Sequence, residues 1–162
     1  MIIYQATAAH WGLIAAIAED SWRTGYAGIL SPEQIDFMLH RTYVMQDFQA
    51  ASQAGESFFL LREGEQDLGF IALAQRPGLL RIEKLYLLTA AQGKGAGKIL
   101  IDFAAAHAQQ LRLNRLALNV NRGNLRAYNF YLKQGFVVTD TVDIPYFQYI
   151  LDDYVLEKDL EA

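Results

Sequence analysis

The stretch Leu85-Tyr86-Leu87-Leu88-Thr89-Ala90-Ala91-Gln92-Gly93-Lys94-Gly95-Ala96-Gly97-Lys98 decides the fold of this chain. The apolar run 85–88 is typical of a strand that is buried on both faces. Three glycines follow between positions 93 and 97, and a helical pattern begins directly after them. Glycines at such a place let backbone N–H groups approach an anion, and the helix N-terminus adds a positive dipole. We therefore predict a strand–turn–helix unit with a phosphate cradle in its turn.

Two well-known phosphate-binding motifs do not fit this turn. A P-loop needs glycine six residues before its lysine and a hydroxyl residue after it, but Gln92 and Ile99 occupy these places. The dinucleotide fingerprint needs a third glycine where the chain has Lys98. A glycine-rich turn that binds no ligand fits these residues equally well, so the turn alone leaves the question open.

The chain before this unit carries both helical and extended patterns. Ser31-Pro32-Glu33-Gln34 predicts a helix start, because serine caps a helix, proline suits its first position and Gln34 completes a capping box. Residues 57–61 and 68–73 flank the polar turn 63–67, which predicts a β-hairpin. The other elements predicted here are a strand at 2–6 and helices at 8–20 and 44–54.

The chain after residue 79 predicts an alternation of strands and helices. We expect strands at 79–88, 116–120, 136–142 and 147–156, a helix with Ile99, Leu100, Phe103, Ala104 and Leu111 on its apolar face, and a helix from Asn124 that stops at Gly135. No linker or repeat interrupts the pattern. This order predicts an α/β fold with a mixed sheet, in a single domain that covers residues 1–162.

Composition excludes several classes of protein. The chain has 162 residues, no cysteine and a formal net charge of −4. The missing cysteines exclude disulfides, thiolate-ligated metals and a thiol nucleophile. The negative charge argues against nucleic acid as a partner. No signal peptide or membrane-spanning run is present, so we expect a cytoplasmic protein without a membrane partner.

A second motif follows the glycine turn at a distance. Gln92-x-x-Gly95-x-Gly97 is joined downstream by Leu118-Asn119-Val120-Asn121-Arg122-Gly123-Asn124-Leu125-Arg126-Ala127-Tyr128-Asn129-Phe130-Tyr131-Leu132-Lys133-Gln134-Gly135-Phe136. Together with the strand 82–88, these motifs resemble the GCN5-related N-acetyltransferase (GNAT) superfamily. The resemblance implies a mixed, mostly antiparallel sheet of about seven strands, with helices on both faces and one splayed pair of parallel strands.

The resemblance also implies acetyl-CoA as co-substrate. The strand with Leu85, Tyr86 and Leu87 would present backbone groups to the pantetheine arm, and an amide near Leu87 would face the thioester oxygen. The implied pyrophosphate cradle consists of Gln92, Gly93, Lys94, Gly95, Ala96, Gly97 and Lys98. Asn124 matches an asparagine that contacts the CoA arm, although asparagine is equally suited to cap the helix that begins there.

Two residues are expected to handle protons. Tyr131 matches the tyrosine that protonates the departing thiolate; its spacing alone would suit a core aromatic. An alkyl ammonium with a pKa of about 10.4 must lose its proton before it attacks, so the reaction needs a base. Glu83 is our candidate, on the face of Leu85 and Leu87 by strand alternation. A surface ion pair with Arg81 or Lys84 is its alternative role.

The resemblance implies a small primary amine as acceptor, polyamine-like in the first instance. The N-terminal helices and the final hairpin carry aromatic residues that suit a cation–π pocket: Trp22, Tyr26, Phe37, Tyr43, Tyr146, Phe147 and Tyr149. A protein or peptide amino group is the alternative acceptor, and a non-catalytic acyl-CoA-binding module is the alternative class. A homodimer is expected from the resemblance alone. The histidines lack ligand spacing, so no metal is predicted.

Overall fold

The computed structural model describes residues 1–161 of the chain. A seven-stranded sheet runs through it in the order β1-β2-β3-β4-β5-β7-β6. Its strands are β1 (Ile2–Gln5), β2 (Glu56–Glu63), β3 (Gln66–Arg76), β4 (Leu79–Leu87), β5 (Arg115–Asn121), β6 (Val137–Tyr146) and β7 (Tyr149–Asp159). Neighbouring strands are antiparallel except for β4 and β5, which are parallel. The mixed sheet implied by the resemblance is thus confirmed.

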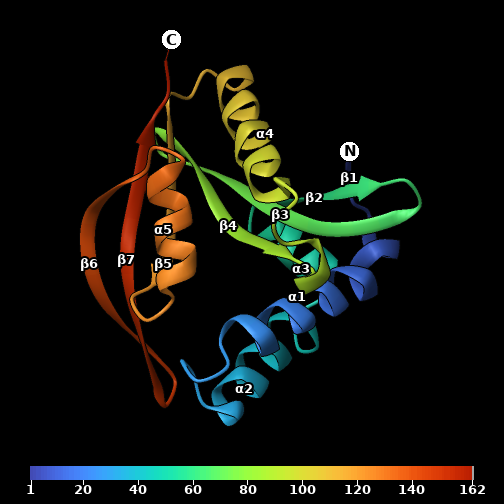
Figure 1. Ribbon diagram of the computed structural model, residues 1–162, viewed down its shortest axis with the longest axis vertical. Coiled ribbons are helices and arrows are strands. Elements are labelled where there is room, and N and C mark those ends of the chain that lie inside the picture. The colour runs from blue at the N-terminus through green and yellow to red at the C-terminus, as the bar shows by residue number, and fades with distance from the viewer. Residues whose placement is uncertain (162) are drawn as a thin grey trace.

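Helices cover both faces of the sheet. They are α1 (Trp11–Gly25), α2 (Pro32–Tyr43), α3 (Phe48–Gln53), α4 (Ala96–Gln110) and α5 (Leu125–Lys133), with 3₁₀ turns at Ala8–His10 and Thr89–Ala91. In Figure 1, β2, β3 and β4 run between α4 above and α1 and α2 below. None of the helices in residues 1–161 is long and apolar enough to cross a membrane.

Side-chain caps decide where two of the helices begin. Ser31 Oγ accepts a hydrogen bond from the Gln34 backbone N at 3.1 Å, which confirms the predicted start of α2. Asp47 Oδ1 accepts one from the Ala50 backbone N at 2.8 Å. Because of this second cap, α3 begins at Phe48, four residues later than the helix that we predicted over 44–54.

The core consists of two apolar layers that the sheet separates. Strand alternation sends Phe58, Leu60 and Phe70 toward α1, α2 and α3, and Phe59 and Leu61 toward the opposite side. On that opposite side, Leu100, Ile101 and Ala104 of α4 are fully buried against Leu116 and Leu118 of β5. Packing on both faces therefore holds β2, β3 and β4 rigidly in the middle of the molecule.

The parallel strands β4 and β5 pair over a very short distance. Their register contains only Leu80 opposite Leu116 and Arg81 opposite Ala117, after which the strands separate. The predicted burial of 85–88 on both faces is therefore wrong, because Leu85, Tyr86 and Leu87 are only partly buried. Leu85, Tyr86 and Leu87 border the space that opens between the two strands. The splayed pair implied by the resemblance is confirmed.

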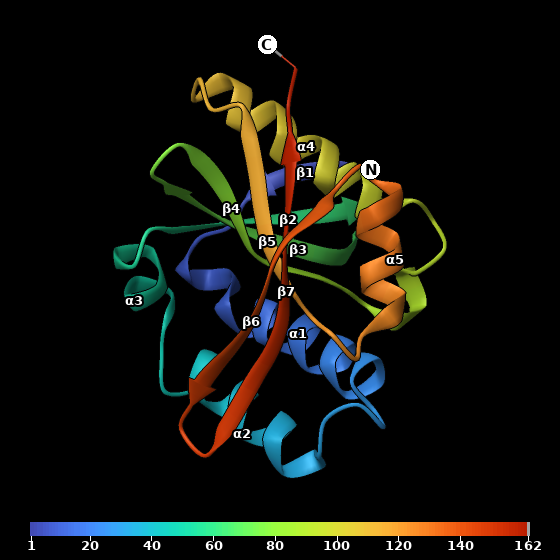
Figure 2. The same ribbon diagram turned by 90° about the vertical axis from the view of Figure 1, so that its left-hand side faces the viewer.

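The hairpin formed by β6 and β7 reaches across to α2. Its tip packs on Phe37, whose ring centroid lies 5.4 Å from that of Phe147 and 5.3 Å from that of Tyr149. The Arg41 guanidinium lies 3.8 Å from the centroid of the Phe147 ring. Figure 2 shows this tip beside α2, at the opposite end of the molecule from α4. The C-terminal strands are thereby anchored to the N-terminal helices.

Candidate active site

A cavity of about 680 Å³ opens where β4 and β5 separate. Residues from α1, β4, the glycine turn, β5 and α5 line it. They include all but one of the predicted site residues: Glu83, Leu85, Tyr86, Leu87, Gln92, Gly93, Gly95, Ala96, Gly97, Lys98, Asn124 and Tyr131. The exception is Lys94, whose Nζ lies 3.6 Å from Glu63 Oε1 in a solvent-exposed ion pair away from the cavity lining.

The glycine turn and the start of α4 form one end of the cavity. Gly93 and Gly95 adopt positive φ angles of 83° and 76°, and a Cβ atom at either position would meet nothing within 4 Å. Gly95 caps α4 without any side-chain hydrogen bond to the first turn. The first N–H groups of a helix have no acceptor within it. The turn therefore presents uncapped donors and open space, which fits a phosphate group.

The separated strands form the middle of the cavity. Beyond Arg81 on β4 and Ala117 on β5, the backbone groups that point across the gap have no strand partner. Leu85 and Leu87 line this part of the wall. Unpaired backbone donors and acceptors beside apolar side chains suit an extended ligand that carries amide groups.

Asn124 lies at the start of α5, where it both caps the helix and lines the cavity. Its Oδ1 accepts a hydrogen bond from the Ala127 backbone N at 3.2 Å, which confirms the predicted capping role. The nearby Tyr26 hydroxyl has a pKa that burial raises, and the polar Asn124 side chain opposes this rise. Asn124 and Tyr26 thus form one polar part of the cavity wall, at the start of α5 and the end of α1.

Tyr131 lies on α5 with its ring between Phe130 and Phe136, at centroid distances of 5.2 and 5.7 Å. The residue also lines the cavity. Burial raises the pKa of its hydroxyl well above the usual value of 10, and the nearby Tyr26 hydroxyl adds to this rise. Tyr131 therefore stays protonated at neutral pH, the state that a proton donor requires.

Glu83 occupies a β-bulge in β4. Ala72 pairs with Lys84 and Leu73 with Ile82, so Glu83 is the extra residue between them. The alternation that we assumed for Glu83 is therefore broken. Leu85 and Leu87 pack toward α4, whereas the Glu83 carboxylate contacts the guanidinium groups of two arginines, one on β3 and one on β4.

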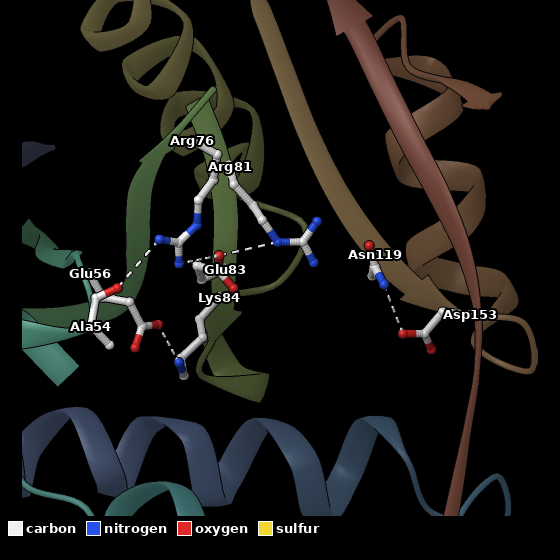
Figure 3. A network of polar contacts seen from close by, with 8 residues as sticks. All are labelled: Ala54, Glu56, Arg76, Arg81, Glu83, Lys84, Asn119 and Asp153. Atoms are coloured by element: carbon white, nitrogen blue, oxygen red, sulfur yellow. Dashed lines mark hydrogen bonds and ion pairs between the residues drawn. The ribbon is translucent and has the colours of Figure 1, made fainter. Parts of the chain in front are cut away.

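The ion pairs of Glu83 share one of its oxygens. Arg76 Nη2 lies 3.3 Å and Arg81 Nε 3.2 Å from Glu83 Oε1 (Figure 3). The predicted pair with Arg81 is confirmed, but the alternative partner Lys84 is wrong, because it pairs with Glu56. Glu83 Oε2 accepts no hydrogen bond from any residue in 1–161.

Sequence reasoning missed Asn119 and Asp153 altogether. Asn119 lines the cavity from β5, and its Nδ2 donates a hydrogen bond to Asp153 Oδ2 on β7 at 3.3 Å (Figure 3). A signal was present in the sequence, because Asn119 and Asn121 alternate with apolar residues in an otherwise buried strand. Polar residues on one face of such a strand indicate a solvated or ligand-binding surface.

Of the seven aromatic residues proposed for an amine pocket, only Tyr26 belongs to the cavity lining. The Trp22 ring packs against Tyr26 and Tyr86 at 4.6 and 5.9 Å between centroids. Tyr43 instead belongs to the core. Phe37 serves to seat the C-terminal hairpin, as described above. The aromatic residues are therefore mainly structural.

No group of three metal-ligating side chains is present within residues 1–161. His107 packs against Phe59 and Phe103 at centroid distances of 5.5 and 5.9 Å. This position on the apolar face of α4 confirms a packing role for the histidine.

A splayed parallel strand pair, with a glycine turn and helix N-terminus at one end of the cleft and a buried tyrosine on its wall, defines a class of acyl-transfer enzymes. The chain belongs to the acetyltransferase (GNAT) family, whose model matches residues 14–136. It is accordingly an N-acetyltransferase.

Comparison with known proteins agrees over nearly the whole chain. It is 28% identical to the spermidine N(1)-acetyltransferase of Thermoplasma acidophilum over 151 residues, which cover 90% of this chain and 89% of that protein. The crystal structure of the PaiA N-acetyltransferase from Thermoplasma acidophilum, in complex with coenzyme A, superposes with a TM-score of 0.83 and 25% identity, covering 98% of this chain and 99% of that one. A GCN5-related N-acetyltransferase from Rhodopseudomonas palustris has a TM-score of 0.84 and 21% identity, at 98% and 95% coverage.

Proposed function

We propose that the protein transfers the acetyl group of acetyl-CoA to a primary amine of a small, polyamine-like molecule, by direct attack in a ternary complex. The observation that carries this proposal is the continuity of one cavity. It runs from the glycine turn, past Tyr131, to the polar side chains of Tyr26, Glu83 and Asn119. A similar protein named for spermidine acetylation supports an amine of this kind as the acceptor.

The binding of acetyl-CoA is assigned to the turn and the separated strands. The N–H groups of residues 95–98 would hold the pyrophosphate, with Lys98 adding charge at the mouth. The backbone of residues 85–87 would bind the pantetheine arm, and an amide near Leu87 would stabilise charge on the thioester oxygen. Acetyl-CoA supplies the activated acetyl group. Asn124 would contact the arm with its amide nitrogen while its oxygen caps α5.

Proton transfer is assigned to two side chains on opposite walls. Tyr131, held protonated by burial, would donate to the leaving thiolate. Glu83 Oε2, which accepts no hydrogen bond within residues 1–161, would take the proton of the attacking amine directly or through a water molecule. The arginines on Oε1 would keep this carboxylate fixed in its bulge. No covalent enzyme intermediate is required.

The alternatives differ in how the cavity is used. A protein or peptide amino group would need an open path for a chain, whereas the tip of the β6–β7 hairpin packs onto α2 and closes that side of the molecule. A non-catalytic acyl-CoA-binding module would have no need of a protonated tyrosine on the cavity wall. The small-amine acetyltransferase accounts for both features. A single domain over 1–162, a cytoplasmic location and a homodimer stay predictions.

Calorimetric titration with acetyl-CoA, and with ATP as the control, tests the binding half of the proposal. We expect saturable binding of acetyl-CoA and none of ATP. A screen of diamines, polyamines, amino acids and peptides, monitored by release of free CoA thiol, tests the transfer half. Binding without release with any amine would contradict the enzyme assignment, and release with peptides alone would favour the protein substrate.

A further inference from the structure

Glu83 lines the cavity, whereas Glu56 and Asp153 lie behind its lining, in contact with the lining residues Lys84 and Asn119, and these three carboxylates differ in their partners. Glu83 is held by two guanidinium groups, and Glu56 is paired with Lys84. Asp153 on β7 has no basic side chain within ion-pair distance among residues 1–161. Its one side-chain hydrogen bond comes from the neutral Asn119 amide at 3.3 Å, onto Oδ2. Asp153 is therefore a carboxylate without a direct counter-ion.

The position of Asp153 follows from strand alternation. The next residue, Tyr154, packs on Tyr128 of α5 with ring centroids 5.0 Å apart, so Asp153 faces the opposite side of the sheet, toward α1. Asn119 and Tyr26 both line the cavity, and the charge of Asp153 acts on the Tyr26 hydroxyl. In Figure 3, the Asn119–Asp153 pair and Arg81 lie on either side of the line along which β4 and β5 separate.

The surroundings make this carboxylate receptive to a cation. Burial raises the pKa of Asp153, and the neighbouring Asp152 adds to the rise. The Asn119 hydrogen bond and the more distant charges of Arg81 and Arg122 oppose it. A partly desolvated charge without a partner is costly, and an ammonium group that binds beside it recovers that cost.

Asp153 and Glu83 stand on strands that β5 separates. Two regular strand spacings correspond to roughly 10 Å between backbones, and the separation of β4 from β5 beyond Arg81 and Ala117 adds to this distance, so an extended acceptor is needed to reach both carboxylates. Glu83 lies on β4, the strand whose residues 85–87 would hold the thioester arm. Asp153 lies farther from that arm, across β5. The two carboxylates are thus suited to two amino groups of one acceptor, of which the one near Glu83 reacts.

We propose that Asp153 is a specificity-determining residue that binds a second ammonium group of the acceptor and so selects diamines and polyamines over monoamines. This inference rests on the proposed function, because it presupposes an amine acceptor at this end of the cavity. Asn119 orients the carboxylate, and Tyr26 forms the neighbouring polar wall.

The test compares two acceptors that differ only in the second amino group, 1,4-diaminobutane and n-butylamine. For the unaltered enzyme we expect a lower KM for the diamine. Asp153→Asn should raise the KM for the diamine about tenfold or more, as expected for loss of a charge-assisted hydrogen bond, with kcat within about twofold. The KM for n-butylamine should not change. Asp153→Glu should restore part of the preference for the diamine.

The matched control is Asp159→Asn, which removes a carboxylate from the same strand at a position that is 85% exposed and pairs with Arg115. It should leave both acceptors unaffected. Calorimetry with acetyl-CoA should give the same affinity for all variants and so report an intact fold. An unaltered enzyme without preference for the diamine would overturn the proposal, as would an equal loss for both acceptors in Asp153→Asn.

Failure of the proposed function gives a different result. If acetyl-CoA binds but no amine is acetylated, the transfer proposal fails and Asp153 is tested by binding alone. Titration of 1,4-diaminobutane into the acetyl-CoA complex should then show binding to the unaltered protein and none to Asp153→Asn. Equal binding to both, or binding to neither, would overturn the role of Asp153.

Discussion

Gly97 on α4 and Phe130 on α5 approach each other so closely that a Cβ atom at Gly97 would lie 2.8 Å from Phe130 Cζ. This contact joins the two helices that flank the cavity. Phe130 in turn packs against Tyr131. The missing side chain at position 97 therefore determines where Phe130 lies and, through it, where Tyr131 is held.

Gly97→Ala should weaken acetyl-CoA binding about fivefold or more, because the added methyl group forces Phe130 to move at a cost of about 1–3 kcal/mol. Calorimetry measures the affinity, and thermal unfolding should show a Tm lower by a few degrees. Phe130→Leu in the same chain frees space and should restore part of the loss. Unchanged affinity and Tm in Gly97→Ala would show that the contact is unimportant.

Gly95→Glu should abolish acetyl-CoA binding, because the new carboxylate would extend into the open space of the turn and repel a phosphate group. Gly78→Glu is the matched control: Gly78 has the same φ of 76° and equally open surroundings, outside the cavity. Both variants carry the same backbone strain. Equal affinities for acetyl-CoA in the two would refute the phosphate cradle.

Tyr131→Phe should lower kcat about 100-fold while acetyl-CoA affinity stays within about twofold, since the change removes a proton donor and keeps the ring. Tyr128→Phe on the same helix removes a hydroxyl that does not line the cavity and should be silent. Steady-state kinetics with calorimetry separates the two effects. A fully active Tyr131→Phe enzyme would exclude Tyr131 as the acid.

Glu83→Gln should lower kcat/KM at neutral pH, and the deficit should shrink as the pH rises toward about 10, the pKa of an alkyl ammonium. At that pH the acceptor arrives unprotonated and needs no base. Rates at pH 7, 8 and 9.5 measure the trend, with Glu63→Gln as a control whose carboxylate pairs with Lys94 outside the cavity. A deficit of the same size at every pH would indicate a structural role for the ion pairs of Glu83.

The protein should be stable up to about pH 10 and lose stability steeply above it. Burial raises the pKa of Tyr43, Tyr86 and Tyr131 in the folded state, whereas the unfolded chain titrates near 10. Above pH 10 the unfolded chain therefore binds fewer protons, and the free energy of unfolding falls by up to about 4 kcal/mol per pH unit for the three groups.

Urea unfolding between pH 8 and 11.5 measures this dependence. Tyr43→Phe removes one titrating group from the core and should reduce the slope above pH 10 by up to about 1.4 kcal/mol per pH unit. A free energy of unfolding that stays constant through pH 11 would show that the three hydroxyls titrate normally in the fold.

Much of the site could be predicted because its signals are local. The positive φ angles of Gly93 and Gly95 and the cap formed by Asn124 depend on residues only a few positions apart. These short-range requirements select particular residue types, so they are visible within a single short segment of the sequence. The same holds for the start of α2 at Ser31.

The remaining features depend on register between distant strands. The bulge at Glu83 is a property of the β3–β4 pairing, and strand alternation alone gives the wrong face. Asn119 meets Asp153 only because β5 pairs with β7, an arrangement that no local pattern encodes. The apolar composition at Leu85 and Leu87 also led to the wrong prediction of burial on both faces. A strand that lines a ligand cavity can have the same composition as a strand that is buried by protein.

Within the described chain, strands β1–β4 are joined to strands β5–β7 by only two β-ladder pairs, Leu80–Leu116 and Arg81–Ala117. Beyond these two pairs, side-chain packing holds the two half-sheets together, including that of α4 on β5 and of the hairpin tip on α2. A ligand that hydrogen-bonds to both open strands would fix the angle between the two half-sheets. Because Glu83 lies on β4 and Asp153 on β7, the same ligand would also fix the distance between their carboxylates. Acetyl-CoA would then bind first, and the amine second, to an acceptor site whose dimensions the first ligand has fixed.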